Sequence, residues 1–342
     1  MFSKLKNLFR ANLVNLVVKK NLLFNDLKNN KKYYLGNKNK DKSFYIIKRR
    51  FNATGMFSNV TFVVDHINHA LKKNKVPIID MENFPTVYNE KYKIKNTSNS
   101  WNYYFLPLNK FSLEEVYQSS NVTFSTDKRI KKTLINNDDE LIKIFNKYIK
   151  INEEIIGKFL KIKKKYFKKN DKIMCVHVRG TLQRIVRGHS LPPHPDDFLK
   201  ESIKIFKKTN CKKIIIITED LIYLNIFKNY FKRKLIYLKV PRSKPFFWGD
   251  HNFHFSKYTR INHRYLLGQE SIIDALILSH ADVKLYTDSN VWRISNIISK
   301  KKQDKFQFVT SKNSNNKFIA RWKWYIKYYF GKIEYKIKKD IT

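Results

Sequence analysis

The sequence KIMCVHVRGTLQRIVRGHSLPPHPDDF, residues 172–198, decides the fold of this chain. It opens with an apolar run, Ile173 to Val178, that predicts a buried strand. The strand passes through Arg179 and Gly180 into a loop that is rich in arginine and histidine. Because open α/β sheets place their ligand sites at the carboxyl ends of parallel strands, this loop is the first candidate for a site.

Arg179 and Gly180 together suit a phosphate group. The Arg179 guanidinium is a planar cation that pairs well with phosphate, and Gly180 lets the backbone approach a ligand closely. A solvated basic loop is the alternative in so lysine-rich a chain, and for Arg184 and Arg187 we favour it. For His177 and Arg179, which end a strand and precede a His-Pro pair, we favour a binding site.

The residues around this stretch predict two α/β domains. In the second half we expect strands at residues 173–178, 213–218, 235–240 and 283–287, with helices at 196–208, 221–231, 269–280 and from 289 onward. In the first half, a strand at 43–48, a break at Gly55, a helix at 58–73 and a strand at 76–80 make one βαβ unit. A long helix from residue 138 links the halves and gives an N-terminal domain at 43–165 and a C-terminal domain at 166–305.

Polar residues also follow two other predicted strands of the second half: Thr218, Glu219 and Asp220 after one, and Thr287, Asp288, Ser289 and Asn290 after the other. The second group leads directly into a helix, and the hydroxyls and free N–H groups of a helix start bind anions. An ordinary N-cap at Ser289 would explain that residue alone, not the convergence of three strand ends. Asp274, in the helix before the last strand, is suited to pair with the edge of a base or with an internal cation.

The composition describes a folded and strongly basic protein. Of 342 residues, 42% are hydrophobic and 15% aromatic, which excludes a disordered chain, and 70 Lys and Arg against 28 Asp and Glu give a net charge of +42. Such a charge favours polyanions, whether nucleic acid, an anionic membrane or a phosphorylated ligand. Cys175 and Cys211 lack disulfide or zinc spacing, which is typical of a reduced compartment. No P-loop, G-x-G-x-x-G, Asp-x-Asp or HExxH pattern occurs, and we predict no metal site.

Both ends of the chain are basic, and the first is amphipathic while the second is a tail rich in aromatic residues. Residues 1–42 open with an acid-free stretch whose apolar residues follow helical spacing, and residues 306–342 mix aromatic residues with lysines. Both compositions suit an anionic membrane surface, although the first segment is equally suited to docking on the protein's own core. No apolar run is long enough to span a bilayer. We therefore expect a cytoplasmic protein that associates peripherally with the inner face of a membrane.

Three segments of the second half resemble motifs of the GDP-fucose fucosyltransferase superfamily: VHVRGT at 176–181, ITED at 217–220 and IIDALILSHADVKLYTDSNVWR at 272–293. This superfamily includes the alpha-1,6-fucosyltransferases, the rhizobial nodulation fucosyltransferase and the protein O-fucosyltransferases. In the first half, NATGMFSN at 52–59 resembles the family's glycine turn that faces the sugar, and VPIIDM at 76–81 is similar to another family segment. The resemblance covers about residues 43–300.

The resemblance implies a GT-B-like α/β fold, in which two Rossmann-like domains face each other across a cleft. It also implies inverting transfer of fucose from the donor GDP-fucose, without metal or other cofactor. The resemblance does not identify the acceptor, and our own hypothesis is a glycan or a lipid-linked saccharide. By analogy with the family, Arg179 would hold the diphosphate and Asp274 would read guanine. The residues predicted to bind the nucleotide sugar are His177, Arg179, Gly180, Thr218, Asp220, Asp274, Thr287, Ser289 and Asn290, with Gly55 and Asn59 from the first domain.

The sequence departs from the family pattern at the catalytic base. The second arginine of the alpha-1,6 branch is Gly180 here, an Asp two residues further on is Leu182, and the loop at 180–195 contains no carboxylate. An inverting attack by a hydroxyl calls for a proton acceptor. His189 is our candidate, because a cationic surrounding keeps a histidine neutral. The alternatives are Asp80 from the first domain and a reaction without a general base.

Other functions compete with this interpretation. A similar enzyme could use a different nucleotide sugar, and a nucleic-acid-binding protein would also carry a charge of +42. Nucleic-acid binding leaves the three polar strand ends unexplained, and the chain has no RNP, KH or zinc-finger signature, so we expect no specific nucleic-acid partner. A membrane scaffold fits both termini but explains nothing in the second half.

Overall fold

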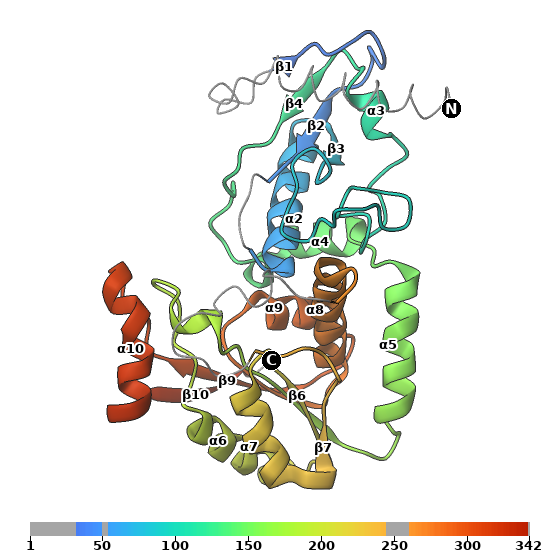
Figure 1. Ribbon diagram of the computed structural model, residues 1–342. Helices are drawn as coiled ribbons and strands as arrows, with labels where there is room; N and C mark the ends of the chain where they lie inside the picture. The colour runs from blue at the N-terminus through green and yellow to red at the C-terminus, as the bar shows by residue number, and fades with distance from the viewer. Residues whose placement is uncertain (1–31, 50–53, 244–259, 341–342) are drawn as a thin grey trace. The chain divides into compact units, whose positions relative to one another are not determined.

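The computed structural model describes residues 32–49, 54–243 and 260–340 (Figure 1). The amphipathic segment predicted at the start of the chain, up to residue 31, lies outside these residues. The chain divides into two compact units, of which unit 1 is Met1–Glu153 with Arg260–Gln269, and unit 2 is Glu154–Thr259 with Glu270–Thr342. Each unit contains one sheet.

Unit 1 is built on a four-stranded sheet in the order β1-β4-β2-β3. Its strands are β1 (Lys32–Tyr33), β2 (Phe44–Ile47), β3 (Val76–Ile79) and β4 (Val122–Phe124). Strand β2 is parallel to β3 and β4, and β1 is antiparallel to β4. Helix α2 (Met56–Lys72) joins β2 to β3 and is buried along most of its length, so the predicted βαβ unit is present. A short helix α3 (Leu113–Val116) precedes β4.

The single long helix predicted between the two halves is two helices in the structure, α4 (Asp139–Tyr148) and α5 (Glu153–Tyr166). Ile151, between them, forms a β-bridge with Phe105. Backbone hydrogen bonds flank this bridge on both sides. Helix propensity favours one continuous helix here, but the pairing with a segment distant in sequence ends α4 and starts α5 anew.

Unit 2 is built on a six-stranded sheet in the order β10-β9-β8-β5-β6-β7. Its strands are β5 (Ile173–His177), β6 (Lys213–Ile217), β7 (Leu235–Ile236), β8 (Val283–Tyr286), β9 (Asp304–Thr310) and β10 (Tyr335–Asp340). Neighbouring strands run parallel except β10, which is antiparallel to β9. The chain moves outward from β5 through β6 and β7, and then continues on the other side of β5 with β8 and β9. Strand order therefore reverses between β5 and β8, the place where doubly wound sheets bind ligands.

The helices of unit 2 enclose this sheet from both sides (Figure 1). Helices α6 (Pro195–Lys208) and α7 (Leu221–Phe231) cover one face through Phe198 and Phe227, which are fully buried with β5, β6 and β8. Helix α9 (Asn290–Ile298) and the part of helix α8 (His263–His280) from Glu270 onward lie on the other face. Pro195 at the first turn and lysines in the last turn suit the start and end of α6.

The residues from 306 onward, predicted as a separate tail, are built into unit 2 as most of β9, helix α10 (Lys317–Phe330) and β10. Trp324 of α10 is buried, and its Nε1 donates to the carbonyl of Pro192 over 2.9 Å. Tyr335 of β10 stacks on Phe308 of β9. In the described part of the chain, no helix combines the length and apolar character needed to cross a membrane.

Candidate functional site

The candidate site of unit 2 lies where the segments after β5 and β8 meet. The N–H of Thr287 donates to the carbonyl of His177 over 3.0 Å, and the N–H of Arg179 donates to Thr287 Oγ1 over 3.4 Å. These two bonds hold the ends of neighbouring parallel strands in register. The polar residues that follow β5 and β8 in the sequence therefore lie at one edge of the sheet.

Arg179 is partly buried at this edge. Within the described residues, its guanidinium makes no ion pair and no side-chain hydrogen bond. Its positive charge acts on two histidines and lowers the pKa of both His177 and His189. A cation with no protein carboxylate paired to it is available to an anionic ligand.

His177 ends β5 and is 4% exposed. Burial lowers its pKa to about 4, with Arg179 adding to the effect and Glu219 opposing it. The ring is therefore neutral near pH 7, and its buried Nδ1 has no hydrogen-bond partner among the described residues. Such an unsatisfied polar atom at a strand end is a point where a ligand atom could bind.

The start of α9 is uncapped by any side chain. Ser289 occupies the N-cap position, but its Oγ is buried and bonds to no described residue. Its neighbours are engaged elsewhere, since Arg293 pairs with Asp288 and donates to Asn290 Oδ1 over 3.2 Å. The first N–H groups of α9 and the Ser289 hydroxyl thus remain available for an anion.

Because Gly180 has no side chain, the backbone at this position packs closely against the side chain of Asp220. A Cβ added there would lie 2.7 Å from Cβ and 2.8 Å from Cγ of Asp220. Asp220 is fully buried, accepts from the N–H of Ile222 over 2.9 Å and pairs with Arg184. Arg184 lies over the ring of Trp324 at 4.2 Å and is 2% exposed.

Two expectations from the sequence change with this arrangement. Arg184 was predicted to be solvated, and that prediction is wrong, because Asp220 neutralises it in the interior. Asp220 was predicted to bind the nucleotide sugar, but both of its carboxylate oxygens are bonded within the protein. As placed, Asp220 supports the loop from Gly180 to Arg184 rather than presenting its carboxylate to a ligand.

Asp274 lies on α8 and is partly exposed, with its carboxylate recessed. Burial raises its pKa well above the usual range, Glu270 adds to this rise, and Arg242 opposes it. No hydrogen bond to the described residues occupies the carboxylate. A recessed carboxylate beside a cation can accept from a donor edge of a base.

Arg242 is a site neighbour that sequence reasoning missed. Its guanidinium donates to the carbonyls of Thr218, Val240 and Leu238 over 3.1, 3.1 and 2.8 Å, and so ties the segment after β7 to the end of β6. The Pro-Arg-Ser sequence that follows the predicted strand was the available signal. Thr218 Oγ1 accepts from the N–H of Asp220 over 3.2 Å and is therefore also engaged within the protein.

His189 is an exposed residue of the loop that leads to α6. Partial desolvation lowers its pKa, Arg179 lowers it further, and Asp288 opposes both. His189, the candidate base, therefore lies near Arg179, the residue predicted to bind the diphosphate. His194, by contrast, is the N-cap of α6 and stacks on Tyr328, and both contacts help to position the loop.

The first-domain candidates lie in unit 1. Asn59 is 3% exposed, and its Oδ1 accepts from Arg49 over 2.8 Å and from Thr54 over 2.9 Å. Gly55 is the N-cap residue of α2, and no described atom lies within 4 Å of a Cβ added there. The aromatic run around Trp101 is buried and belongs to the core.

Asp80, the alternative base, is fully buried in unit 1. It accepts from the N–H groups of Glu82 and Asn83, from Asn83 Nδ2 and from the hydroxyl of Tyr117, at 2.7–3.1 Å. Burial raises its pKa, and these hydrogen bonds oppose the rise. A carboxylate with four donors is a structural centre for the turn after β3, not a free proton acceptor.

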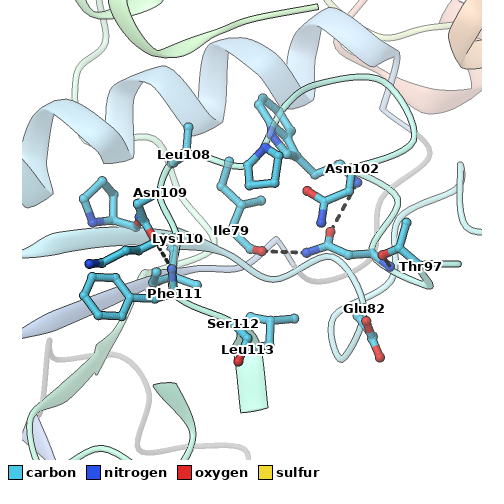
Figure 2. Close-up of a pocket in the computed structure, with 15 residues that line it drawn as sticks. Ile79, Glu82, Thr97, Asn102, Leu108, Asn109, Lys110, Phe111, Ser112 and Leu113 are labelled. Carbon is cyan, nitrogen blue, oxygen red and sulfur yellow. Dashed lines mark hydrogen bonds between the residues drawn. The ribbon is translucent and has the colours of Figure 1, made fainter. Parts of the chain in front are cut away.

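Unit 1 also contains a cavity of about 340 Å³ along its edge strand β3 (Figure 2). Asn99 and Asn109 form part of its wall and donate to the carbonyls of Ile79 and Pro77, over 2.7 and 2.8 Å. These bonds satisfy the open edge of the sheet. In the ranges that the structure describes, no cluster of three or more His, Cys, Asp and Glu could hold a metal ion.

Comparison with known proteins identifies similar structures but no similar sequences. No family model matches the chain, and a search of the curated proteins finds no match. NodZ alpha-1,6-fucosyltransferase soaked with GDP-fucose is similar at a TM-score of 0.51 and 14% identity, over 78% of this chain and 95% of that one. The same enzyme co-crystallised with GDP gives 0.51 and 13%, over 79% and 96%.

Fucosyltransferase NodZ from Bradyrhizobium gives a TM-score of 0.52 at 11% identity, over 88% of this chain and all of that one. The likeness covers both units, each with its own sheet. The predicted α/β, GT-B-like fold class is confirmed, and the chain shares the fold of the NodZ fucosyltransferase.

Proposed function

We propose that the protein is an inverting glycosyltransferase that transfers fucose from GDP-fucose to a glycan or lipid-linked saccharide. The observation that carries the proposal is the free start of α9, with the unpartnered Ser289 hydroxyl, at the edge where the unpaired Arg179 lies. Two positive groups at the reversal of strand order suit a diphosphate. The fold shared with NodZ, whose structures hold GDP-fucose or GDP, supports the same ligand class.

In the proposed reaction, Arg179 and the start of α9 stabilise the negative charge of the leaving group. An acceptor hydroxyl attacks the anomeric carbon on the face opposite the diphosphate, a new C–O bond forms, and the bond to the diphosphate breaks with its electron pair. Arg179 and the α9 N–H groups stabilise the growing negative charge. This arrangement supplies the positive charge from the protein, so we expect no requirement for a divalent metal.

The proton of the attacking hydroxyl passes to an imidazole nitrogen of His189. A base must be unprotonated at the working pH, and the lowered pKa of His189 keeps it so. The hydrogen bonds that occupy Asp80 weaken that alternative. Asp274 is proposed to accept from the guanine N1–H and 2-amino groups, a pair of donors that adenine does not present.

A different nucleotide sugar remains the second candidate, because the diphosphate is common to many donors. No described contact selects fucose, whereas the proposed role of Asp274 would select guanine. Non-specific binding of nucleic acid follows from a net charge of +42 alone and would not require the polar residues that follow β5 and β8. We further propose a cytoplasmic location with peripheral attachment to an anionic membrane, where a lipid-linked acceptor would be found.

Ligand-dependent thermal stability tests the proposal directly. We expect GDP to raise Tm saturably in the presence of EDTA, and UDP, CDP and ADP to raise it less. Arg179→Ala should remove the GDP response while Tm without ligand stays the same, since Arg179 contributes no ion pair. Arg187→Ala, an exposed arginine of the same loop, is the matched control. A response to UDP but not GDP, or a need for added metal, would refute the proposal.

A further inference from the structure

Helix α10 presents large apolar side chains to solvent along one face. Its large side chains are exposed at Phe318 by 74%, Ile319 by 51%, Ile326 by 57%, Tyr329 by 59% and Phe330 by 89%. With Trp322, which lines the same groove as the first three, they form what we call the outer face of α10. Single exposed apolar residues are ordinary in soluble proteins, but a contiguous patch on one helix marks an interaction surface.

The opposite side of α10 is fixed to unit 2. Ala320, Trp324 and Tyr325 are buried, and Trp324 bonds to the carbonyl of Pro192 and stacks on Tyr328 at 4.8 Å. The helix therefore does not need the outer face to hold its place in the fold. Side chains three and four residues apart share a face of a helix, so this second stripe is set by the sequence itself.

The basic residues of α10, together with the lack of acidic ones, indicate which kind of partner would cover its outer face. The sequence of α10, KFIARWKWYIKYYF, has four basic residues and no acidic one. Lys323 and Lys327 line the groove beside the apolar side chains, and their Nζ atoms contact the carbonyls of Lys312 and Lys332, not a carboxylate. An apolar stripe bordered by lysines matches a surface that is apolar inside and anionic outside, which is a bilayer with acidic headgroups.

Charge disfavours the other occupants. A second copy would bring +42 against +42, and the first 25 residues of the same chain are basic and acid-free. Single-stranded nucleic acid could stack on the aromatic rings, but Ile319 and Ile326 offer no ring to a base. A lipid interface accepts aliphatic and aromatic side chains alike.

We propose that the outer face of α10 inserts into an anionic membrane surface and anchors unit 2 there. The proposal rests on the membrane attachment suggested above and assigns it to one helix. Phe318, Ile326 and Phe330 enter the boundary between headgroups and acyl chains, while the flanking lysines contact lipid phosphates. For an enzyme with a lipid-linked acceptor, such an anchor keeps acceptor and protein on the same surface.

Vesicle sedimentation with the full chain tests this anchor. Vesicles of phosphatidylcholine with phosphatidylserine should bind the parent, and vesicles of phosphatidylcholine alone should bind it much more weakly. Phe318→Ser, Ile326→Ser and Phe330→Ser together should weaken binding to the anionic vesicles by roughly tenfold or more. Tyr34→Ser, Tyr92→Ser and Leu160→Ser together, which replace three similarly exposed side chains, should leave it unchanged.

The outcomes separate this inference from the proposed activity. A GDP response that persists in the α10 variant, with vesicle binding lost, supports the anchor and shows that the variant is folded. Unchanged vesicle binding in that variant, equal binding to neutral vesicles, or a parent dimer that the variant converts to monomer would each overturn it. Lys323→Glu with Lys327→Glu is a second variant that keeps the apolar face, and it should also lose preference for the anionic vesicles. A single-stranded oligonucleotide that displaces the protein from vesicles through α10 would favour the nucleic-acid alternative.

Discussion

At the scale of single residues, the candidate site depends on the packing of Gly180 against Asp220. Because an added Cβ would lie 2.7 Å from the Asp220 Cβ, Gly180→Ala must displace Asp220 and strain its pair with Arg184. We expect a loss of about 1–3 kcal/mol in the free energy of unfolding, measured by denaturant titration.

Gly157→Ala is the matched control for that variant. Gly157 lies inside α5, and apart from its chain neighbours and the adjacent backbone of the helix no described atom is within 4 Å of the added Cβ. The higher helix propensity of alanine should therefore stabilise the chain by about 0.5–1 kcal/mol. Equal stability of Gly180→Ala and the parent would contradict the tight packing at Asp220.

The proton acceptor is the second prediction at this scale. His189→Gln should lower kcat roughly a hundredfold or more, leave the response of Tm to GDP unchanged and remove the acidic limb of the pH profile, where protonation of the base lowers turnover. Asp80→Asn should instead lower stability, because it disturbs a carboxylate with four hydrogen-bond donors. Normal turnover and pH profile in His189→Gln would show that this histidine is not the base.

At the scale of elements, strand β8 and helix α9 are joined by a buried lysine. Lys284 is 0% exposed, and its Nζ donates to Ser295 Oγ over 3.2 Å and to Asn296 Oδ1 over 3.0 Å. Burial is the main cause that lowers its pKa from 10.5 to about 7, and Lys305 and Lys301 add to it. Strand β8, which positions the start of α9, therefore carries a lysine whose neutral form is favoured by burial.

This lysine makes stability depend on pH. Between about pH 7 and pH 10.5 the unfolded chain binds more protons at this position than the folded chain, so the free energy of unfolding rises with pH across that window. Lys284→Met should flatten the rise, as measured by denaturation midpoints of variant and parent at several pH values within it. An equally steep rise in both proteins would mean that other groups cause it.

At the scale of the whole molecule, net charge opposes folding. With +42 over 342 residues, repulsion among surface cations destabilises the compact state. Raising NaCl from about 0.05 M to about 0.5 M shortens the Debye length and should raise Tm by a few degrees. An equimolar KCl series should give the same result, and a Tm that falls with either salt would contradict the expectation.

Some elements of unit 2 are predictable from the sequence with their bounds, and others are not. The predicted strand at 213–218 and helix at 221–231 correspond to β6 at Lys213–Ile217 and α7 at Leu221–Phe231, because apolar runs and an Asp N-cap are local signals. The strand predicted at 235–240 is only Leu235–Ile236, since the following segment turns and is tied down by Arg242.

By itself, the sequence determined the alternation of strands and helices, the polar strand ends and the amphipathic character of α10, because periodicity and capping act within a few residues. Tertiary structure decided the break between α4 and α5, the burial of Arg184 with Asp220 and the addition of β9 and β10 to the sheet. Each of these depends on partners far away in the chain. A basic residue in a loop looks solvated in a sequence until the fold brings a buried carboxylate and an aromatic ring to it.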